Sequence, residues 1–232
     1  MKLTAKVFID QLTLLRVKNN SDNSRFFHGK DTKNKFLDIR MSAIFSLAKQ
    51  YKQLPLDEIE KLLESNFYEV RMGAVSILDF QARDKKIFAE KGKSLYELYI
   101  RRHDRINNWD LVDRSAPYVI GGYLFDKSRK PLYKLAKSKN VWERRTSIVA
   151  TYFFIRQNEI EDTFNIAEML IHDKHDLINK AVGSWIREAG KRDKQRLLDF
   201  LDEYASTMPR VTLRYAIEKL DKKIKEKYLT LR

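Results

Sequence analysis

The sequence lacks cysteine and is poor in glycine and proline. Among its 232 residues there are no cysteines, 7 glycines and 4 prolines. Without cysteine, the chain can form neither disulfide bonds nor a thiolate metal site. Because glycine and proline interrupt regular structure, their scarcity predicts long regular elements joined by short turns.

Long apolar runs are also missing. The longest, at residues 148–155, is too short to cross a bilayer, and the apolar run at residues 7–9 is too short for a signal peptide. We therefore expect a soluble cytoplasmic protein that does not associate with membranes.

Positive charge is abundant. Charged residues make up 34% of the chain and hydrophobic residues 43%, so the chain has enough apolar surface to fold. The formal net charge is +14. An excess of this size in a folded domain favours nucleic acid as the partner, although a basic surface without a ligand is the alternative.

Helical periodicity dominates the pattern of apolar residues. Phe8, Leu12 and Leu15 recur at the spacing of one helix face, and no stretch shows sustained strand alternation or a glycine-rich phosphate loop. We therefore predict an all-α protein. Similar faces are formed by Met41, Ile44, Ala48 and Tyr51, by Val70, Ala74, Ile77 and Leu78, and by Ile148, Tyr152 and Ile155.

A weak internal repeat runs through the sequence. Five segments consist of a short turn, a charged residue and an apolar helix, and aligning their charged residues gives gaps of about 42, 32, 35 and 34 residues. This period is typical of stacked antiparallel helix pairs, which form a curved solenoid. Equivalent positions then lie in a row, which predicts a concave basic groove. The aligned residues are Arg71, Asp113, Arg145, Lys180 and Arg214.

One segment interrupts this pattern. Residues 20–35 are polar, contain Gly29 and lack an apolar period, so we predict a loop there. No other stretch has the composition of a linker. We therefore expect a single HEAT-like repeat domain over residues 1–232.

The local pattern with the most chemical content is NNWDLVDRSAP. Trp109 and Asp113 are four residues apart, so a helix places them on one face, and Pro117 either kinks that helix or starts a new one. Arg145 occupies the matching position of the next repeat. Each residue also has a purely structural interpretation: a core aromatic for Trp109, a helix cap or ion-pair partner for Asp113, and a solvated charge for Arg145.

The histidines do not suggest a metal site. His28 and His103 are isolated, and His172 with His175 fits a solvated turn better than a pair of ligands. We therefore expect no metal and no cofactor.

Three ordered motifs, NNWDLVDRSAP, KNVWERRTSIV and INKAVGSWIREAGKRD, resemble the AlkD-type alkylpurine DNA glycosylases over roughly residues 40–215. The resemblance implies a stack of HEAT-like repeats that hydrolyses the glycosidic bond of cationic N3- and N7-alkylpurines in double-stranded DNA. It implies that Trp109 and Asp113 are the catalytic residues and that Arg145 opens the following repeat.

The chemistry of these residue types fits that reaction. An alkylated purine is already a good leaving group, and the sugar develops positive charge that the Asp113 carboxylate can stabilise. The indole face of Trp109 attracts a cation, and Arg145 can bind a backbone phosphate. We expect a monomer. Further DNA contacts are predicted at Arg144, Lys180, Arg71, Arg214 and Trp185.

Two departures from the family pattern define the alternatives. Where the family typically has KAIGW, this chain has KAVGSW, so Ser184 stands at the tryptophan position and Trp185 follows one residue later. One residue is about 100° around a helix, which turns Trp185 towards the core. Many relatives also have an additional DNA-contacting helix where residues 20–35 lie. The alternatives are therefore a weak or inactive paralogue, and a HEAT-like scaffold that binds an acidic protein.

Overall fold

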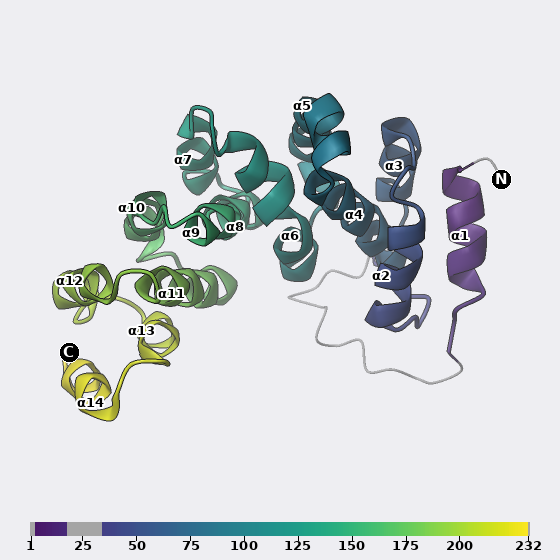
Figure 1. The fold of residues 1–232 in the computed structure, drawn as a ribbon. Helices are drawn as coiled ribbons and strands as arrows, with labels where there is room; N and C mark the ends of the chain where they lie inside the picture. Colours follow the sequence, from purple (N-terminus) through teal and green to yellow (C-terminus); the bar gives the residue numbers. More distant parts are fainter. Residues whose placement is uncertain (1–2, 18–33, 232) are drawn as a thin grey trace. The chain divides into compact units, whose positions relative to one another are not determined.

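The computed structural model describes residues 3–17 and 34–231, and this part of the chain is helical without a β-strand (Figure 1). One isolated bridge joins Lys35 to Phe67. None of the described helices is long and apolar enough to cross a membrane. The helical elements are α1 (Ala5–Thr13), α2 (Met41–Gln50), α3 (Leu56–Leu63), α4 (Tyr68–Arg83), α5 (Lys85–Arg101), η2 (His103–Arg105), α6 (Trp109–Ala116), η3 (Pro117–Gly122), α7 (Lys130–Ala136), α8 (Val141–Ala150), α9 (Tyr152–Arg156), α10 (Glu161–Leu170), α11 (Asp176–Gly190), α12 (Lys194–Tyr204), α13 (Arg210–Ile217) and α14 (Lys222–Thr230).

The chain forms two compact units, an N-terminal unit over Met1–Tyr123 and a C-terminal unit over Leu124–Arg232. The predicted HEAT-like helical repeat is confirmed, because each of the five aligned charged residues lies in a helix of its own, α4, α6, α8, α11 or α13. The single domain and the continuous groove stay predictions.

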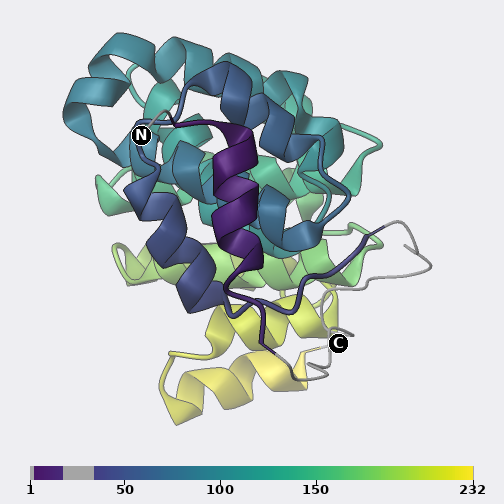
Figure 2. The same cartoon turned by 90° about the vertical axis from the view of Figure 1, so that its right-hand side faces the viewer.

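Helix α4 is the centre of the N-terminal unit. It lies beside α2, α3, α5 and α6 (Figure 1) and packs against them. Nearly all of its side chains are buried. Gly73 of α4 lets the Phe8 ring of α1 approach closely, because a Cβ at that position would lie 2.5 Å from the ring. Helix α1 brings Phe8 and Leu12, both fully buried, against this core, and it packs on α2 and α3 (Figure 2). Burying each such side chain contributes about 1.5–3 kcal/mol.

Helix α1 is shorter than its apolar spacing predicts. It begins after Thr4, whose hydroxyl accepts a hydrogen bond from Val7 N at 3.3 Å, and it ends at Thr13. Leu15 therefore lies beyond the last turn and is 41% exposed, so its predicted place on the buried face was wrong. The helix ends because the chain turns back along residues 37–38, where Val17 N donates to the Asp38 carbonyl at 3.1 Å.

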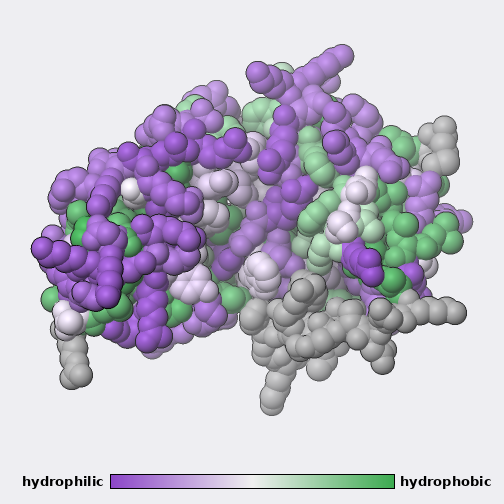
Figure 3. All heavy atoms as spheres, turned by 60° about the horizontal axis from the view of Figure 1, so that its bottom comes forward, coloured by the Kyte–Doolittle hydropathy of each residue, from purple (hydrophilic) through white to green (hydrophobic). Residues whose placement is uncertain are grey.

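Helix α11 is the centre of the C-terminal unit. It packs against α8, α10, α12 and α13. Its approach to α13 is close: a Cβ at Gly183 would lie 2.4 Å from the Thr212 carbonyl oxygen and 2.6 Å from Tyr215 Cβ. Hydrophilic residues dominate the face of this unit that Figure 3 shows.

Pro117 starts a new helical segment. Helix α6 ends at Ala116, and the π-helical element η3 follows at once, with Pro117 in helical geometry at φ −54° and ψ −49°. Proline has no N–H to donate to the ladder, so the wider turn begins where that bond is missing.

The predicted loop lies mostly outside the described residues, which resume at Asn34. From there the chain is held against the first turn of α4. The buried carboxylate of Glu69 accepts hydrogen bonds from Leu37 N and Asp38 N, each at 3.0 Å. This contact fixes the chain immediately before α2.

Candidate functional site

An open pocket of about 460 Å³ lies within the N-terminal unit. Its walls come from α2, α4 and α6, so it uses three helices that the core already holds together. The pocket is lined by methionine, aromatic, acidic and arginine side chains. Its lining residues are Met41, Phe45, Met72, Arg83, Trp109, Asp110, Asp113 and Arg114.

The start of α6 positions the predicted catalytic pair. Asn108 caps the helix, because its side-chain oxygen accepts a hydrogen bond from Trp109 N at 2.8 Å. Trp109 is thus the first helical residue, and Asp113 follows one turn later on the same face. Both line the pocket and both are half-buried. The indole therefore remains accessible from the pocket.

Asp110 is a second carboxylate in the same pocket. The hydroxyl of the fully buried Tyr68 donates a hydrogen bond to it, and its other oxygen accepts one from Leu111 N at 2.9 Å. Burial raises the pKa of Asp110 to about 6, although the Tyr68 bond acts in the opposite direction. The negative charge of Asp113 adds to the rise. The pocket therefore contains a carboxyl group that titrates close to neutral pH.

Arg71 supports the same end of α6 from beneath. It is 1% exposed, and its Nη1 donates to the Ser65 carbonyl at 2.9 Å. Its Nη2 donates to Asn107 at 3.3 Å and to the side chain of Asn34. Arg71 thus joins the end of α3, the chain at Asn34 and the segment that leads into Trp109. Its predicted role as a DNA contact stays a prediction.

A buried ion pair lies beside the pocket. Asp79 lies in α4 and is fully buried. Its Oδ2 accepts a hydrogen bond from Arg83 Nε at 2.8 Å and forms an ion pair with Arg114 Nη1 at 3.1 Å. Burial raises the pKa of Asp79, and the guanidinium groups of Arg114 and Arg83 oppose that rise. One carboxylate thus holds two arginines of the pocket wall.

Two predicted DNA contacts lie in α8 of the C-terminal unit. Arg144 forms an ion pair with Asp173 at 2.6 Å and donates to the carbonyls of Ser138 and Lys139 at 3.0 and 3.1 Å. Arg145 is 7% exposed, and its Nη1 donates to the Leu177 carbonyl at 2.6 Å. Arg144 therefore contacts the turn that precedes α11, and Arg145 contacts the first turn of α11. The meeting of Arg145 with Trp109 and Asp113 stays a prediction, because Arg145 belongs to the other unit.

The remaining predicted contacts also lie in the C-terminal unit. Lys180 is half-exposed and forms an ion pair with Asp176 at 2.6 Å, whereas Arg214 on α13 is exposed. Trp185 is half-buried and packs on Tyr152, with 5.0 Å between the ring centroids. Its Nε1 is closed to solvent and has no hydrogen-bond partner among the described residues.

A family model described as DNA alkylation repair enzyme matches residues 11–220. The chain belongs to this family. No curated protein sequence matches it.

Two solved structures have the same fold as this family member. A predicted DNA alkylation repair enzyme from Enterococcus faecalis is 17% identical, with a TM-score of 0.64 over 82% of this chain and 90% of that one. The crystal structure of AlkD2 from Streptococcus mutans is 18% identical, with a TM-score of 0.55 over 94% of this chain and 100% of that one. At these identities the likeness supports the helical repeat fold.

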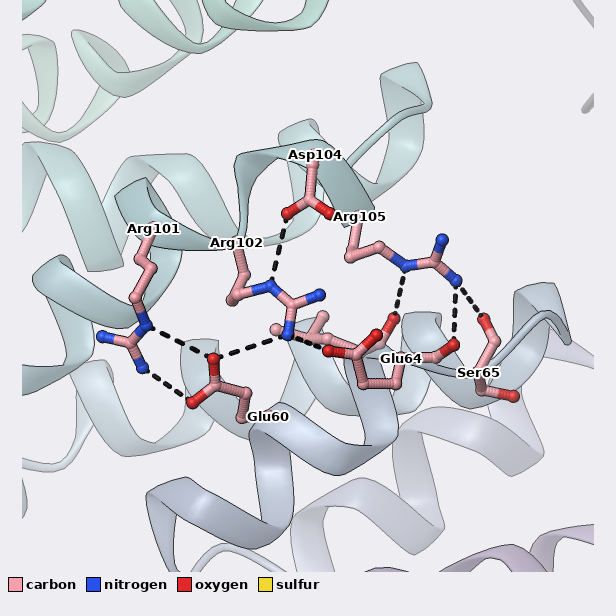
Figure 4. A network of polar contacts seen from close by, with 8 residues as sticks. Glu60, Glu64, Ser65, Arg101, Arg102, Asp104 and Arg105 are labelled. Carbon is pink, nitrogen blue, oxygen red and sulfur yellow. Dashed lines mark hydrogen bonds and ion pairs between the residues drawn. The ribbon is translucent and has the colours of Figure 1, made fainter.

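Several basic residues of this family member have structural partners instead of pointing into the pocket. Figure 4 shows Arg101 and Arg102 converging on Glu60, with the closest contact at 2.7 Å, while Arg102 also reaches Glu64. The hydrogen bond from Arg101 is the main reason why the pKa of Glu60 is lowered. Arg105 donates to three carbonyls at the end of α3 at 2.9–3.0 Å. These contacts join α3 to α5 and η2.

Among the described residues, no cluster of acidic or histidine side chains could hold a metal ion. His172 and His175 lie in the turn between α10 and α11, as predicted. His175 caps α11, because its Nδ1 accepts a hydrogen bond from Leu177 N at 3.2 Å.

Sequence reasoning missed the residues that support the pocket. Tyr68, Asp110 and Arg114 were not singled out, because their partners lie far away in the sequence. Asp79 left a signal: it is the one charged residue between apolar neighbours in VSILDF, and Arg83 follows four residues later. That spacing is typical of a helical ion pair.

Proposed function

We propose that this protein hydrolyses the N-glycosidic bond of cationic N3- and N7-alkylpurines in double-stranded DNA. The observation that carries the proposal is the placement of Trp109 and Asp113 one helical turn apart in the wall of one open pocket. Membership in the DNA alkylation repair enzyme family supports this choice over the protein-binding scaffold.

The pocket chemistry suits a substrate whose leaving group is already activated. When the bond between C1′ and the purine nitrogen breaks, the alkylated base leaves with the bonding electrons and becomes neutral. The sugar becomes an oxocarbenium ion, which the Asp113 carboxylate stabilises while water adds to C1′. A water proton goes to solvent or to the carboxylate. The indole of Trp109 offers a face to the cationic nucleotide before the bond breaks.

The test is release of free base from a duplex that contains N7-methylguanine. Wild-type protein should release it faster than the spontaneous rate. Asp113→Asn should lower the catalysed rate about 100-fold or more, because it removes a charge placed against the developing cation. Asp57→Asn, which changes an exposed carboxylate at the start of α3, is the matched control and should keep the wild-type rate. Base release that is equal in both variants would refute the role of Asp113.

The second candidate is a paralogue that binds DNA with little or no base release. The packing of Trp185 on Tyr152 favours it, because an indole held within its own unit has less surface to offer a substrate. Ser184 at the neighbouring position has no ring to replace it. Duplex binding without base release above the spontaneous rate would select this candidate over the glycosylase.

A further inference from the structure

The pocket has two chemically different walls. Trp109, Asp110 and Asp113 provide an aromatic face with two carboxyl groups, whereas Arg83 and Arg114 provide two guanidinium groups. Under the proposed function, the first wall receives a cationic base. A nucleotide carries its negative charge on the phosphate. The positive charge of the second wall is therefore complementary to the phosphate of the same nucleotide.

Arg114 is held rigidly in that second wall. Its guanidinium carbon lies 4.7 Å from the centre of the Phe45 ring and 4.8 Å from that of Phe80. Its Nε donates to Ser76 Oγ at 3.2 Å, and its Nη1 forms the ion pair with Asp79 at 3.1 Å. Nη2 has no hydrogen-bond partner among the described residues. A donor on a side chain that is already immobilised loses little conformational entropy when it binds a ligand.

Arg83 is also held by Asp79 and an aromatic ring, but its side chain is more exposed than that of Arg114. Its Nε donates to Asp79 at 2.8 Å, and its guanidinium carbon lies 3.7 Å above the centre of the Tyr118 ring. The side chain is nevertheless 42% exposed. No described residue accepts a hydrogen bond from its two Nη atoms, so both are available as donors on a guanidinium group that Asp79 and the Tyr118 ring hold in place.

Asp79 keeps the two arginines together and neutralises only one of their two positive charges. One buried carboxylate serves two guanidinium groups, so this cluster of Asp79, Arg83 and Arg114 carries one net positive charge. Planar guanidinium groups with free donors match the oxygens of a phosphate and bind it with charge-assisted hydrogen bonds. The cluster therefore has the features of an anion site: excess positive charge, a fixed geometry and donors that no described residue occupies.

We propose that Arg83 and Arg114 bind a backbone phosphate of the DNA strand whose nucleotide lies against Trp109. The inference rests on the proposed function only for the identity of the ligand as DNA. It adds to that function a phosphate contact within the N-terminal unit, made by residues outside the row of aligned repeat positions. Asp79 is the positioning residue of this site.

Salt-dependent DNA binding tests the proposal with the full-length protein. The probe is a fluorescein-labelled undamaged duplex, and its affinity is measured by anisotropy over a series of NaCl concentrations. Arg83→Gln should weaken binding several-fold and reduce the slope of log affinity against log salt by about one, because one phosphate contact is lost. Arg83→Lys keeps the charge and should restore the slope, with affinity between those of wild type and Arg83→Gln.

The control removes an equal charge outside the pocket. Lys86 is exposed in the first turn of α5 and does not line the pocket, so Lys86→Gln should keep the wild-type slope. Equal slopes for Arg83→Gln and Lys86→Gln would overturn the phosphate site, as would a wild-type protein that does not bind duplex DNA at low salt. Thermal melting followed by circular dichroism verifies that the variants remain folded.

Failure of the phosphate site and failure of the glycosylase give different results. Asp113→Asn should keep the salt slope of the wild type and lose base release. If the wild type releases no base but Arg83→Gln still lowers the slope relative to Lys86→Gln, the glycosylase is refuted and the phosphate site is supported. If the wild type releases base and those two variants have equal slopes, the glycosylase is supported and the phosphate site is refuted.

Discussion

Asp110→Asn should change how the stability of the N-terminal unit depends on pH. The carboxyl group of Asp110 is largely enclosed in the pocket, where burial raises its pKa to about 6, whereas an aspartate in an unfolded chain has a pKa of about 3.9. Asparagine has nearly the same shape as the protonated carboxyl group and does not titrate. The amide has one acceptor oxygen where the carboxylate has two, and the lost hydrogen bond shifts stability equally at every pH. The change of the difference with pH therefore reports the free-energy cost of the buried charge.

The sign follows from which state binds the proton more tightly. Because the pKa of the folded state is the higher one, the folded protein holds the proton between about pH 4 and pH 6, where the unfolded chain has already released it. The contribution of Asp110 to the free energy of unfolding is therefore greatest below about pH 4, and it is lost as the pH rises through 6. The gap between the two pKa values corresponds to about 3 kcal/mol.

The assay is urea unfolding of wild type and Asp110→Asn at a series of pH values. Trp109 is the only tryptophan of the N-terminal unit, so its fluorescence in a background with Trp142→Phe and Trp185→Phe follows this unit alone. Relative to wild type, Asp110→Asn should gain up to about 3 kcal/mol between pH 4 and pH 7. The difference cancels the titration of all other groups.

Tyr68→Phe provides a second comparison. It removes the hydrogen bond that lowers the pKa of Asp110, so the transition should move above pH 6. A difference between wild type and Asp110→Asn that stays flat from pH 4 to pH 7 would refute the reasoning. A relative loss of stability in Asp110→Asn on raising the pH would show that the carboxylate is stabilised as an anion instead.

Two other changes should reduce stability, as urea unfolding can measure. Gly183→Ala should destabilise the C-terminal unit by about 1–3 kcal/mol, because the new Cβ would meet the Thr212 carbonyl and Tyr215; a gain of about 1 kcal/mol from helix propensity alone would contradict this packing. Asp79→Asn should cost the N-terminal unit about 3 kcal/mol, because it leaves the enclosed Arg114 without its anion; a change below about 0.5 kcal/mol would mean that the pair is solvated.

Much of the helical fold follows from apolar spacing. Ile44, Ala48 and Tyr51 are buried at the predicted spacing, and the aligned charged residues each occupy a helix. Helix ends are less predictable. Leu14 and Leu15 continue the apolar pattern of α1 past Thr13, and no glycine or proline marks the end of the helix. Tertiary contacts, and not a local sequence signal, determine where this helix ends.

Only part of the candidate site could be predicted from the sequence. The four-residue spacing of Trp109 and Asp113 determines that they share a helix face, which is a local property. The pairing of Asp110 with Tyr68 depends on how α6 packs against α4, because 42 positions separate the two residues. A single sequence predicts which side chains share a face of one helix. It does not predict the raised pKa of Asp110, because that shift arises from burial between helices.

The arginines show why charge alone is a poor guide to a nucleic-acid surface in this fold. In an antiparallel helix pair, the start of the second helix lies beside the end of the first, where carbonyl groups lack intrahelical partners. Arg71 and Arg144, near the starts of α4 and α8, donate to carbonyls just beyond α3 and α7, and Arg105 does the same from η2. The net charge of +14 therefore includes guanidinium groups that the fold itself uses. Arg83, the last residue of α4, differs because its Nε bonds to the Asp79 carboxylate and no described carbonyl group accepts a hydrogen bond from its guanidinium group. We therefore expect phosphate contacts from arginines whose donors no described residue occupies, whether or not they lie in the row of aligned positions.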